Sequence, residues 1–116
     1  MKHAGLLVLA LISGIAAAGT QTGTVNLDQS SYASNATSPG YMFFTLSGGM
    51  KTGNPACSTI AGGNRWVINN SWPAAKAQLA ILLLAISTGK QVRITGSNDC
   101  AVWGDSETAI DMQVLN

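Results

Sequence analysis

"SWPAAKAQLAILLLAISTGKQVRITG", residues 71–96, decides the fold because one kind of sequence gives way to another inside it. The first part is rich in Ala and Leu, which are strong helix formers, and Ser71 and Gly89 suit the N-cap and the C-terminal stop of a helix. The second part alternates apolar and polar residues, which is typical of a strand with one buried face. The stretch therefore predicts a helix over 71–89 and a strand over 90–96.

The expected helix has more apolar residues than one face requires. A stripe at the spacing i, i+3, i+4 and i+7 would cover a sheet, and its members are Leu79, Leu82, Leu83 and Ile86. Ile81 and Leu84 lie outside this stripe. They would either enlarge the core or be buried by neighbouring subunits of an oligomer, and both alternatives stay open.

The segments around the helix predict four more short strands. These segments alternate in polarity or are rich in β-favouring residues, and they span 23–28, 41–46, 65–69 and 107–116. In the last of them, alternation puts Ile110, Met112 and Val114 on the core side. The stretch 29–40, rich in Ser and Asn, is expected to be a long loop.

These elements give a mainly β chain with one helix, of the α+β class, in the order β-β-β-α-β-β. Five short strands and one helix suit a small OB-fold-like barrel with Greek-key connections, in which the helix would close one end. A flat α+β sandwich is the alternative. About 98 residues follow the first 18, which is enough for one domain with a modest core and too few for two, so we expect a single domain.

The first 18 residues have the features of a signal peptide. A positive end, an apolar run and small residues follow one another, and cleavage is expected after Ala18 or Gly19. A membrane anchor is the alternative, but the apolar core of about ten to twelve residues falls short of the roughly twenty that a spanning helix needs. We therefore expect a signal peptide over 1–18, one domain over 19–116, a secreted or periplasmic location and no stable membrane insertion.

Charge and composition argue against some classes of function for this chain. The chain has six Lys and Arg, of which Lys2 lies in the expected signal peptide, against five Asp and Glu. This balance gives no electrostatic footprint for nucleic acid. The one histidine, His3, also lies in the expected signal peptide, so the domain lacks the side chain that most often transfers protons near neutral pH. We expect no enzyme, no catalytic residue and no cofactor.

Three acidic residues near the end of the chain, Asp105, Glu107 and Asp111, are candidates for acid–base chemistry or calcium binding. Their spacing matches neither an EF-hand loop nor another diagnostic pattern. Asp105 suits a turn before the last strand, and Asp111 suits the solvated face of that strand. We interpret the acids as the polar side of this segment and expect no metal site.

The cysteines Cys57 and Cys100 predict one disulfide, because an even count in an exported chain favours pairing. A two-cysteine metal site is the rival, but it lacks histidine partners. Closing the loop between them would stabilise the fold by about 4 kcal/mol in the chain-entropy model. Trp103, three residues after Cys100, is expected to pack beside the bridge. We therefore interpret residues 98–107 as a segment that stabilises the fold rather than as a functional site.

Several features together resemble the subtilase cytotoxin B-subunit family and its small secreted relatives. They are the signal peptide, "GTV" in the first strand, the interval from Cys57 to Trp66, the join "TGKQVRI" and the late cysteine in "GSNDC". The resemblance implies an OB-fold subunit, which in the toxins forms a pentameric ring, binds sialylated glycans and delivers a catalytic subunit. A homo-oligomer and a catalytic toxin subunit are the protein partners that it implies.

The sugar contacts of the toxin family carry over only in part. A hydroxyl residue before the Gly-Val of the first strand is present as Thr22. The tyrosine after "VRI" is replaced by Gly96, and the glutamine after the second strand falls near Met50. The resemblance therefore implies the fold more strongly than it implies the glycan site.

Glycan recognition combines aromatic surfaces with a few oriented polar groups. In and beside the first long loop, residues of these types are Thr22, Tyr32, Ser34, Asn35 and Tyr41. An ordinary polar loop is the alternative interpretation. We expect a secreted, non-enzymatic binding module for cell-surface glycans, and the alternative is a stand-alone secreted or periplasmic structural protein that binds no glycan.

Overall fold

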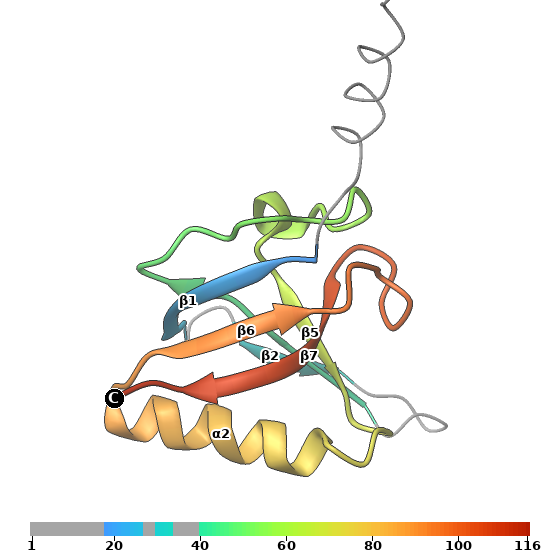
Figure 1. Ribbon diagram of the computed structural model, residues 1–116. Coiled ribbons are helices and arrows are strands. Elements are labelled where there is room, and N and C mark those ends of the chain that lie inside the picture. The colour runs from blue at the N-terminus through green and yellow to red at the C-terminus, as the bar shows by residue number, and fades with distance from the viewer. Residues whose placement is uncertain (1–17, 27–29, 34–39) are drawn as a thin grey trace, which may run out of the picture.

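The computed structural model describes residues 18–26, 30–33 and 40–116. These residues form a mostly β fold with one long helix, which runs along one side of the strands (Figure 1). The elements in chain order are β1 (Thr20–Val25), β2 (Ser31–Ala33), β3 (Tyr41–Phe44), β4 (Leu46–Ser47), the 3₁₀ helix η2 (Ile60–Gly63), β5 (Trp66–Asn69), α2 (Ala75–Thr88), β6 (Val92–Gly96) and β7 (Glu107–Val114).

The strands form one mixed sheet of seven in the order β2-β3-β5-β7-β6-β1-β4. Neighbouring strands are antiparallel except β5 and β7, which are parallel. Within the described residues the edge strands β2 and β4 do not pair with each other, so the sheet is open. The expected mainly β chain with one helix is confirmed, but the five-stranded barrel is wrong.

Two short strands account for this correction. β2 lies inside the stretch expected to be a loop and pairs with β3. The strand expected over 41–46 divides at Thr45, because β3 pairs with β5 whereas β4 pairs with β1. Alternation along a chain shows which residues share a face, but it does not show where a strand changes its partner.

The helix α2 packs on the sheet, and its contacts are with β1, β5 and β7. Its buried residues are Ala75, Gln78, Leu82 and Ala85. The stripe expected from the sequence is therefore wrong at Leu83, which is 66% exposed. Apolar residues occur on every side of this helix, so their spacing does not single out the buried face. Ala75 and Ala85, which lie outside the expected stripe, are buried instead of Leu83.

Of the two ends of α2, only the C-terminal end is as expected. Gly89 caps the C-terminus with a left-handed φ of 68°, as a helix-ending glycine does. The N-cap is Ala74, which makes no side-chain hydrogen bond, and Ser71 lies in the turn before it. Outside the expected stripe, Ile81 packs against the core whereas Leu84 is 53% exposed.

A β-bulge part-way along β7 changes the face of the sheet on which its side chains lie. Met112 lies opposite Ile94 and faces the core, but Gly96 lies opposite Ala109 rather than Ile110. The extra residue reverses the alternation, so Ala109 is fully buried and Ile110, which was expected inside, is 49% exposed. The residues before the bulge therefore face the opposite way from what the alternation predicts.

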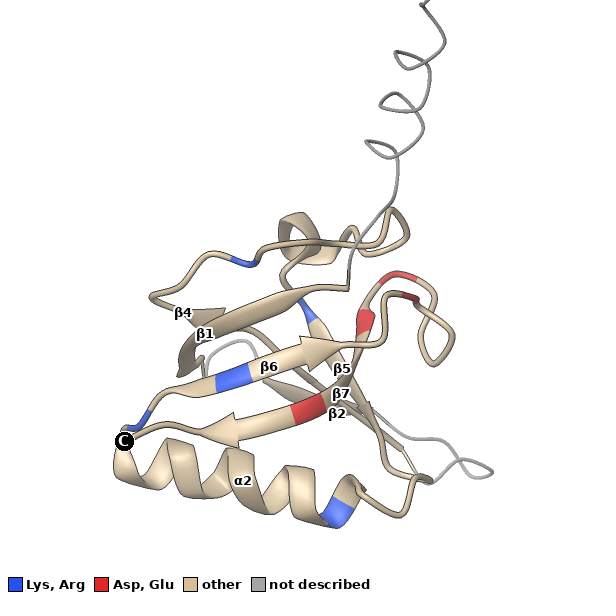
Figure 2. Cartoon of the chain, in the orientation of Figure 1, with Lys and Arg blue, Asp and Glu red and all other residues tan. Residues whose placement is uncertain are grey.

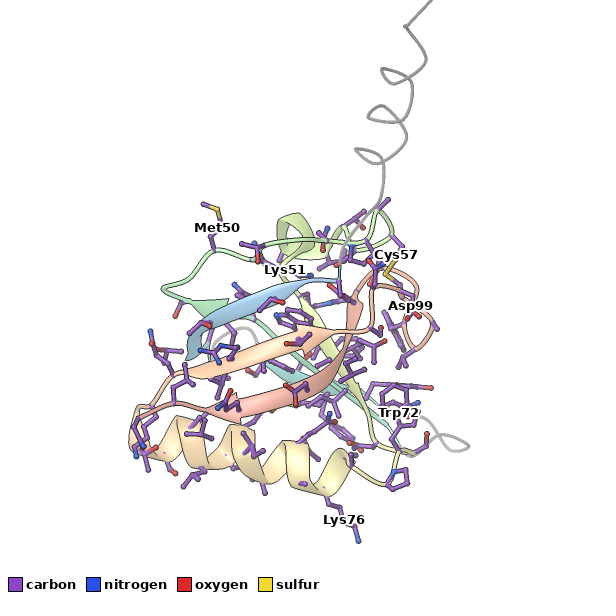
Figure 3. All side chains as sticks on the ribbon, in the orientation of Figure 1. Met50, Lys51, Cys57, Trp72, Lys76 and Asp99 are labelled. Atoms are coloured by element: carbon purple, nitrogen blue, oxygen red, sulfur yellow. A yellow bond between two sulfur atoms is a disulfide. The ribbon has the colours of Figure 1, made fainter. Side chains whose placement is uncertain are left out.

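The expected disulfide is confirmed, with the Cα atoms of Cys57 and Cys100 6.1 Å apart. It joins the long loop before β5 to the loop after β6 (Figure 3).

The expected signal peptide falls on residues outside the described range, apart from Ala18. Among the helices of the described residues, none has the length and apolar character needed to cross a membrane.

Candidate functional site

The residues predicted to bind glycan lie in separate parts of the sheet. Thr22 is on β1, opposite Arg93 of β6. Tyr32 is on β2 and Tyr41 on β3, and β5, β7 and β6 lie between β3 and β1 in the strand order. Ser34 and Asn35 lie outside the described residues.

Tyr32 and Tyr41 occupy opposite faces of the sheet. Ala33 is the partner of Tyr41, while Tyr32 is the partner of Met42. Directly opposed residues share a face and consecutive residues alternate, so the Tyr32 side chain lies on the other face from Tyr41. Its hydroxyl accepts a hydrogen bond from Asn70 Nδ2 at 2.5 Å. The structure therefore does not bring Thr22, Tyr32 and Tyr41 together.

Tyr41 instead belongs to an aromatic cluster with Trp103, from the loop between β6 and β7. The Trp103 ring lies edge-on to Tyr41 at 5.3 Å and to Phe43 at 5.0 Å between centroids. Phe43 is buried, whereas Trp103 is 37% exposed. Trp103 is confirmed to pack, against Tyr41 and Phe43, whereas its packing beside the disulfide stays a prediction, and the residue is partly exposed to solvent.

Charged side chains lie at the border of this cluster. Arg65 lies over the Phe43 ring, with Cζ 4.6 Å from its centroid. Its Nη2 donates to Asp105 Oδ1 at 2.7 Å and its Nε donates to Ser106 Oγ at 2.8 Å. We call Tyr41, Arg65, Trp103 and Asp105 the Trp103 surface. It combines an exposed ring with oriented polar groups.

A second charged group lies inside the domain. Glu107 is fully buried, and its Oε1 lies 2.9 Å from Lys51 Nζ, whose side chain is 4% exposed. Its Oε2 accepts hydrogen bonds from the backbone N–H groups of Gly19 and Asn98, each at 2.9 Å. Asn98 adopts a positive φ of 66°, a conformation that Asn tolerates better than most residues. The interpretation of the acids as solvated is therefore wrong for Glu107, although Asp111 is exposed.

Lys51 is held by more than its ion pair. Its ammonium donates to Asn54 Oδ1 at 2.7 Å and to the Gly63 carbonyl at 2.8 Å, and it lies 4.2 Å from the centroid of the Trp66 ring. Burial lowers the pKa of Lys51 below its ordinary 10.5, while the hydrogen bond and charge of Glu107 act in the opposite direction. Figure 3 shows Lys51 on the long loop that also carries Met50 and Cys57.

Gly96 is part of the same buried group. A Cβ atom at this position would lie 2.1 Å from Glu107 Oε2, so the Glu107 carboxylate fills the space that a side chain would need. The tyrosine that the toxin resemblance places there would not fit beside Glu107. Met50, the other position where the sugar contacts differ, is 87% exposed.

Sequence reasoning missed Glu107 because the bulge in β7 reverses the alternation between Met112 and Ala109. Counting back from Met112 in steps of two places Glu107 on the outer face. No local sequence signal marks this bulge, and only the pairing of Gly96 with Ala109 reveals it. Trp103 was identified, but its partners Tyr41 and Phe43 are distant in the sequence.

The chain matches no known family model, no curated protein and no solved structure in comparisons with each. The toxin B-subunit resemblance therefore stays a prediction.

The part of the chain that the structure describes has no pocket and no cluster of three or more metal-ligating side chains. Its charged residues are spread over separate elements (Figure 2).

Proposed function

We propose that this chain is a secreted, non-enzymatic binding module that holds carbohydrate on the Trp103 surface. The observation that carries the proposal is the partly exposed Trp103, whose ring lies edge-on against Tyr41 and Phe43 beside the Arg65–Asp105 pair. Sugars offer apolar C–H faces ringed by hydroxyl groups. An immobilised aromatic ring matches the first feature, and a charged pair that can both donate and accept hydrogen bonds matches the second.

The disulfide supports the compartment in this proposal. Disulfides persist in oxidising environments such as the periplasm and the extracellular space, and they are rare in the cytosol. The Cys57–Cys100 bond therefore agrees with export of the chain, as the expected signal peptide does. Cell-surface glycans are accessible to a protein in that location.

The surface is suited to weak, shallow recognition rather than to enclosure of a ligand. Trp103 and Asp105 lie on one loop, and this loop is anchored because the backbone N–H of Thr59 donates to the Asp105 carbonyl at 3.1 Å. An anchored loop loses little conformational freedom on binding, which favours affinity. An oligomer would add avidity by presenting several such surfaces together.

An oligomer and a catalytic toxin subunit remain predictions from the resemblance. Leu83 and Leu84 of α2 are 66% and 53% exposed, and they are the residues through which neighbouring copies would bury apolar area. Light scattering after size exclusion tests this directly. A monomer at micromolar concentration would remove the pentamer without affecting the proposed sugar surface.

A glycan array with sialylated and neutral sugars tests the proposed function. We expect saturable binding that free sugar competes, and a loss of about tenfold in affinity for Trp103→Ala, with partial retention in Trp103→Phe. Tyr32→Ala is the matched control, because Tyr32 is also an exposed aromatic residue but lies on the other face, and we expect its affinity to stay within about twofold of wild type. Silence across the whole array would overturn the proposal in favour of a structural protein.

A further inference from the structure

The backbone nitrogen of Gly19 lies inside the folded domain. Gly19 is buried, and its N–H donates to Glu107 Oε2 at 2.9 Å. Its carbonyl accepts a hydrogen bond from the N–H of Gly96 at 2.9 Å. Ala18, the residue before it, is partly exposed. The chain therefore enters the domain between Ala18 and Gly19.

The Glu107 carboxylate, which accepts the hydrogen bond from Gly19, can accept a further one. Glu107 Oε1 is buried and lies 2.9 Å from Lys51 Nζ, and a carboxylate oxygen with one such partner can still accept a second donor. A Cβ atom at Gly19 would lie 2.4 Å from this oxygen, so the backbone of Gly19 packs directly against the carboxylate. Glycine is the residue that can occupy this position without moving Glu107.

The sequence independently places the expected signal-peptide cleavage here, after Ala18 or Gly19, so the Ala18–Gly19 bond is one of two candidates. Hydrolysis after Ala18 by a leader-removing protease adds one water across the C–N bond. The carbonyl carbon of Ala18 takes the hydroxyl group and leaves as a carboxylate, while the Gly19 nitrogen gains protons. An α-amino group is largely protonated at neutral pH, so Gly19 would carry an ammonium with three N–H donors instead of one.

We propose that cleavage occurs between Ala18 and Gly19 and that Glu107 is the binding site for the new α-ammonium of Gly19. The amide nitrogen already lies at hydrogen-bond distance from Oε2, and two further N–H groups would be available to the carboxylate, whose Oε1 has Lys51 as its partner. Hydrogen bonds between charged groups are stronger than those between neutral ones. Removal of the leader therefore adds a stabilising contact to the mature domain.

The alternative cleavage, after Gly19, would not produce this contact. The new ammonium would then lie on Thr20, whose N–H already donates to the Thr52 carbonyl at 2.8 Å in a β-bridge. Glu107 would also lose the Gly19 donor. The structure thus distinguishes two cleavage positions that the sequence leaves equal.

Lys51 does not prevent Glu107 from accepting a second cation. Its ammonium has Asn54 Oδ1, the Gly63 carbonyl and the Trp66 ring as further partners, so it does not depend on Glu107 alone. Glu107 then lies between the two cations.

Intact-mass measurement and N-terminal sequencing of the exported full-length precursor give the first test. We expect the mature chain to begin at Gly19. A chain that begins at Thr20, or that keeps residues 1–18, would overturn the proposal.

Three purified forms that begin at Ala18, Gly19 and Thr20, each with the disulfide formed, give the second test. We expect the Gly19 form to have the largest equilibrium constant of folding, about tenfold above the Ala18 form. N-acetyl-Gly19 protein is the matched control, because it has the same residues but an amide in place of the ammonium, and it should behave like the Ala18 form. Equal stability of the Gly19 and acetylated forms would overturn the proposed contact. Neither test involves sugar, so both are independent of the proposed function.

Discussion

Asp105 and Glu107 are two residues apart in the sequence, and each forms an ion pair with a basic residue from an earlier segment. The Arg65–Asp105 pair is 2.7 Å long, and its side chains are 24% and 40% exposed. The Lys51–Glu107 pair is 2.9 Å long, and its side chains are 4% and 0% exposed. Water can replace a lost partner in the first pair but not in the second, so burial rather than distance decides how much each contributes.

Breaking the buried pair should have the largest effect. Glu107→Gln leaves the Lys51 ammonium buried without an anion, and we expect it to lower the free energy of unfolding by about 3–5 kcal/mol. Urea unfolding followed by circular dichroism measures this change. The double variant Lys51→Met/Glu107→Gln removes both charges and should recover part of the loss. A Glu107→Gln protein as stable as wild type would contradict the comparison.

Opening the disulfide should have the next largest effect, because the bond holds together the two loops that carry Lys51 and Asp105. The cysteines are 43 residues apart, and a loop of that length corresponds to about 4 kcal/mol in the chain-entropy model, although measured values are often smaller. Thermal unfolding with and without dithiothreitol checks this prediction, with Cys57→Ser/Cys100→Ser as the permanent counterpart. An unchanged melting temperature would show that the loops hold without it.

Breaking the exposed pair should have a small effect. Asp105→Asn keeps the shape of the side chain and removes its charge, and we expect a loss of at most about 1 kcal/mol in the free energy of unfolding. High salt should reduce this difference further, because ions screen exposed charges. A loss as large as that of Glu107→Gln would mean that exposure does not separate the two pairs.

The pH dependence of the buried pair should give the smallest effect, since burial and Glu107 act on the pKa of Lys51 in opposite directions. Burial dominates and lowers that pKa, so between the lowered value and 10.5 the folded chain binds fewer protons than the unfolded chain. Stability therefore rises with pH across this interval, and the contribution is lost as pH falls through the lowered pKa.

Lys51→Arg is the matched variant for this measurement, because arginine stays protonated throughout the interval. Denaturant titrations at several alkaline pH values should show wild type gaining stability relative to Lys51→Arg as the pH approaches 10.5. A difference between the two proteins that does not vary with pH would contradict the prediction.

The sequence predicted those parts of the fold that depend on local preferences. The helix stop at Gly89 and the Cys57–Cys100 bond are both present. Each depends on a residue type whose backbone preference or covalent chemistry is nearly independent of context. The mainly β class with one helix follows from the same local signals.

The parts that depend on pairing could not be predicted. Nothing local shows that the run around Thr45 serves two different partner strands, or that a bulge opposite Gly96 turns Glu107 inward. The candidate site could not be predicted for the same reason. Tyr41 contacts Trp103 through tertiary packing, whereas Tyr32, on the strand next to that of Tyr41, lies on the other face of the sheet. Composition suggested aromatic residues for a site, but the register of the sheet decides which of them meet.

The position of β1 in the sheet has a consequence for the kinetics of folding. β1 lies between β4 and β6, and its residues Thr20 to Gly23 pair with Thr95 to Val92. Contacts between such distant segments form slowly, because a long loop must close before they gain any stability. The sheet can be completed only after almost the whole chain has been synthesised, so we expect this domain to fold after translation rather than during it.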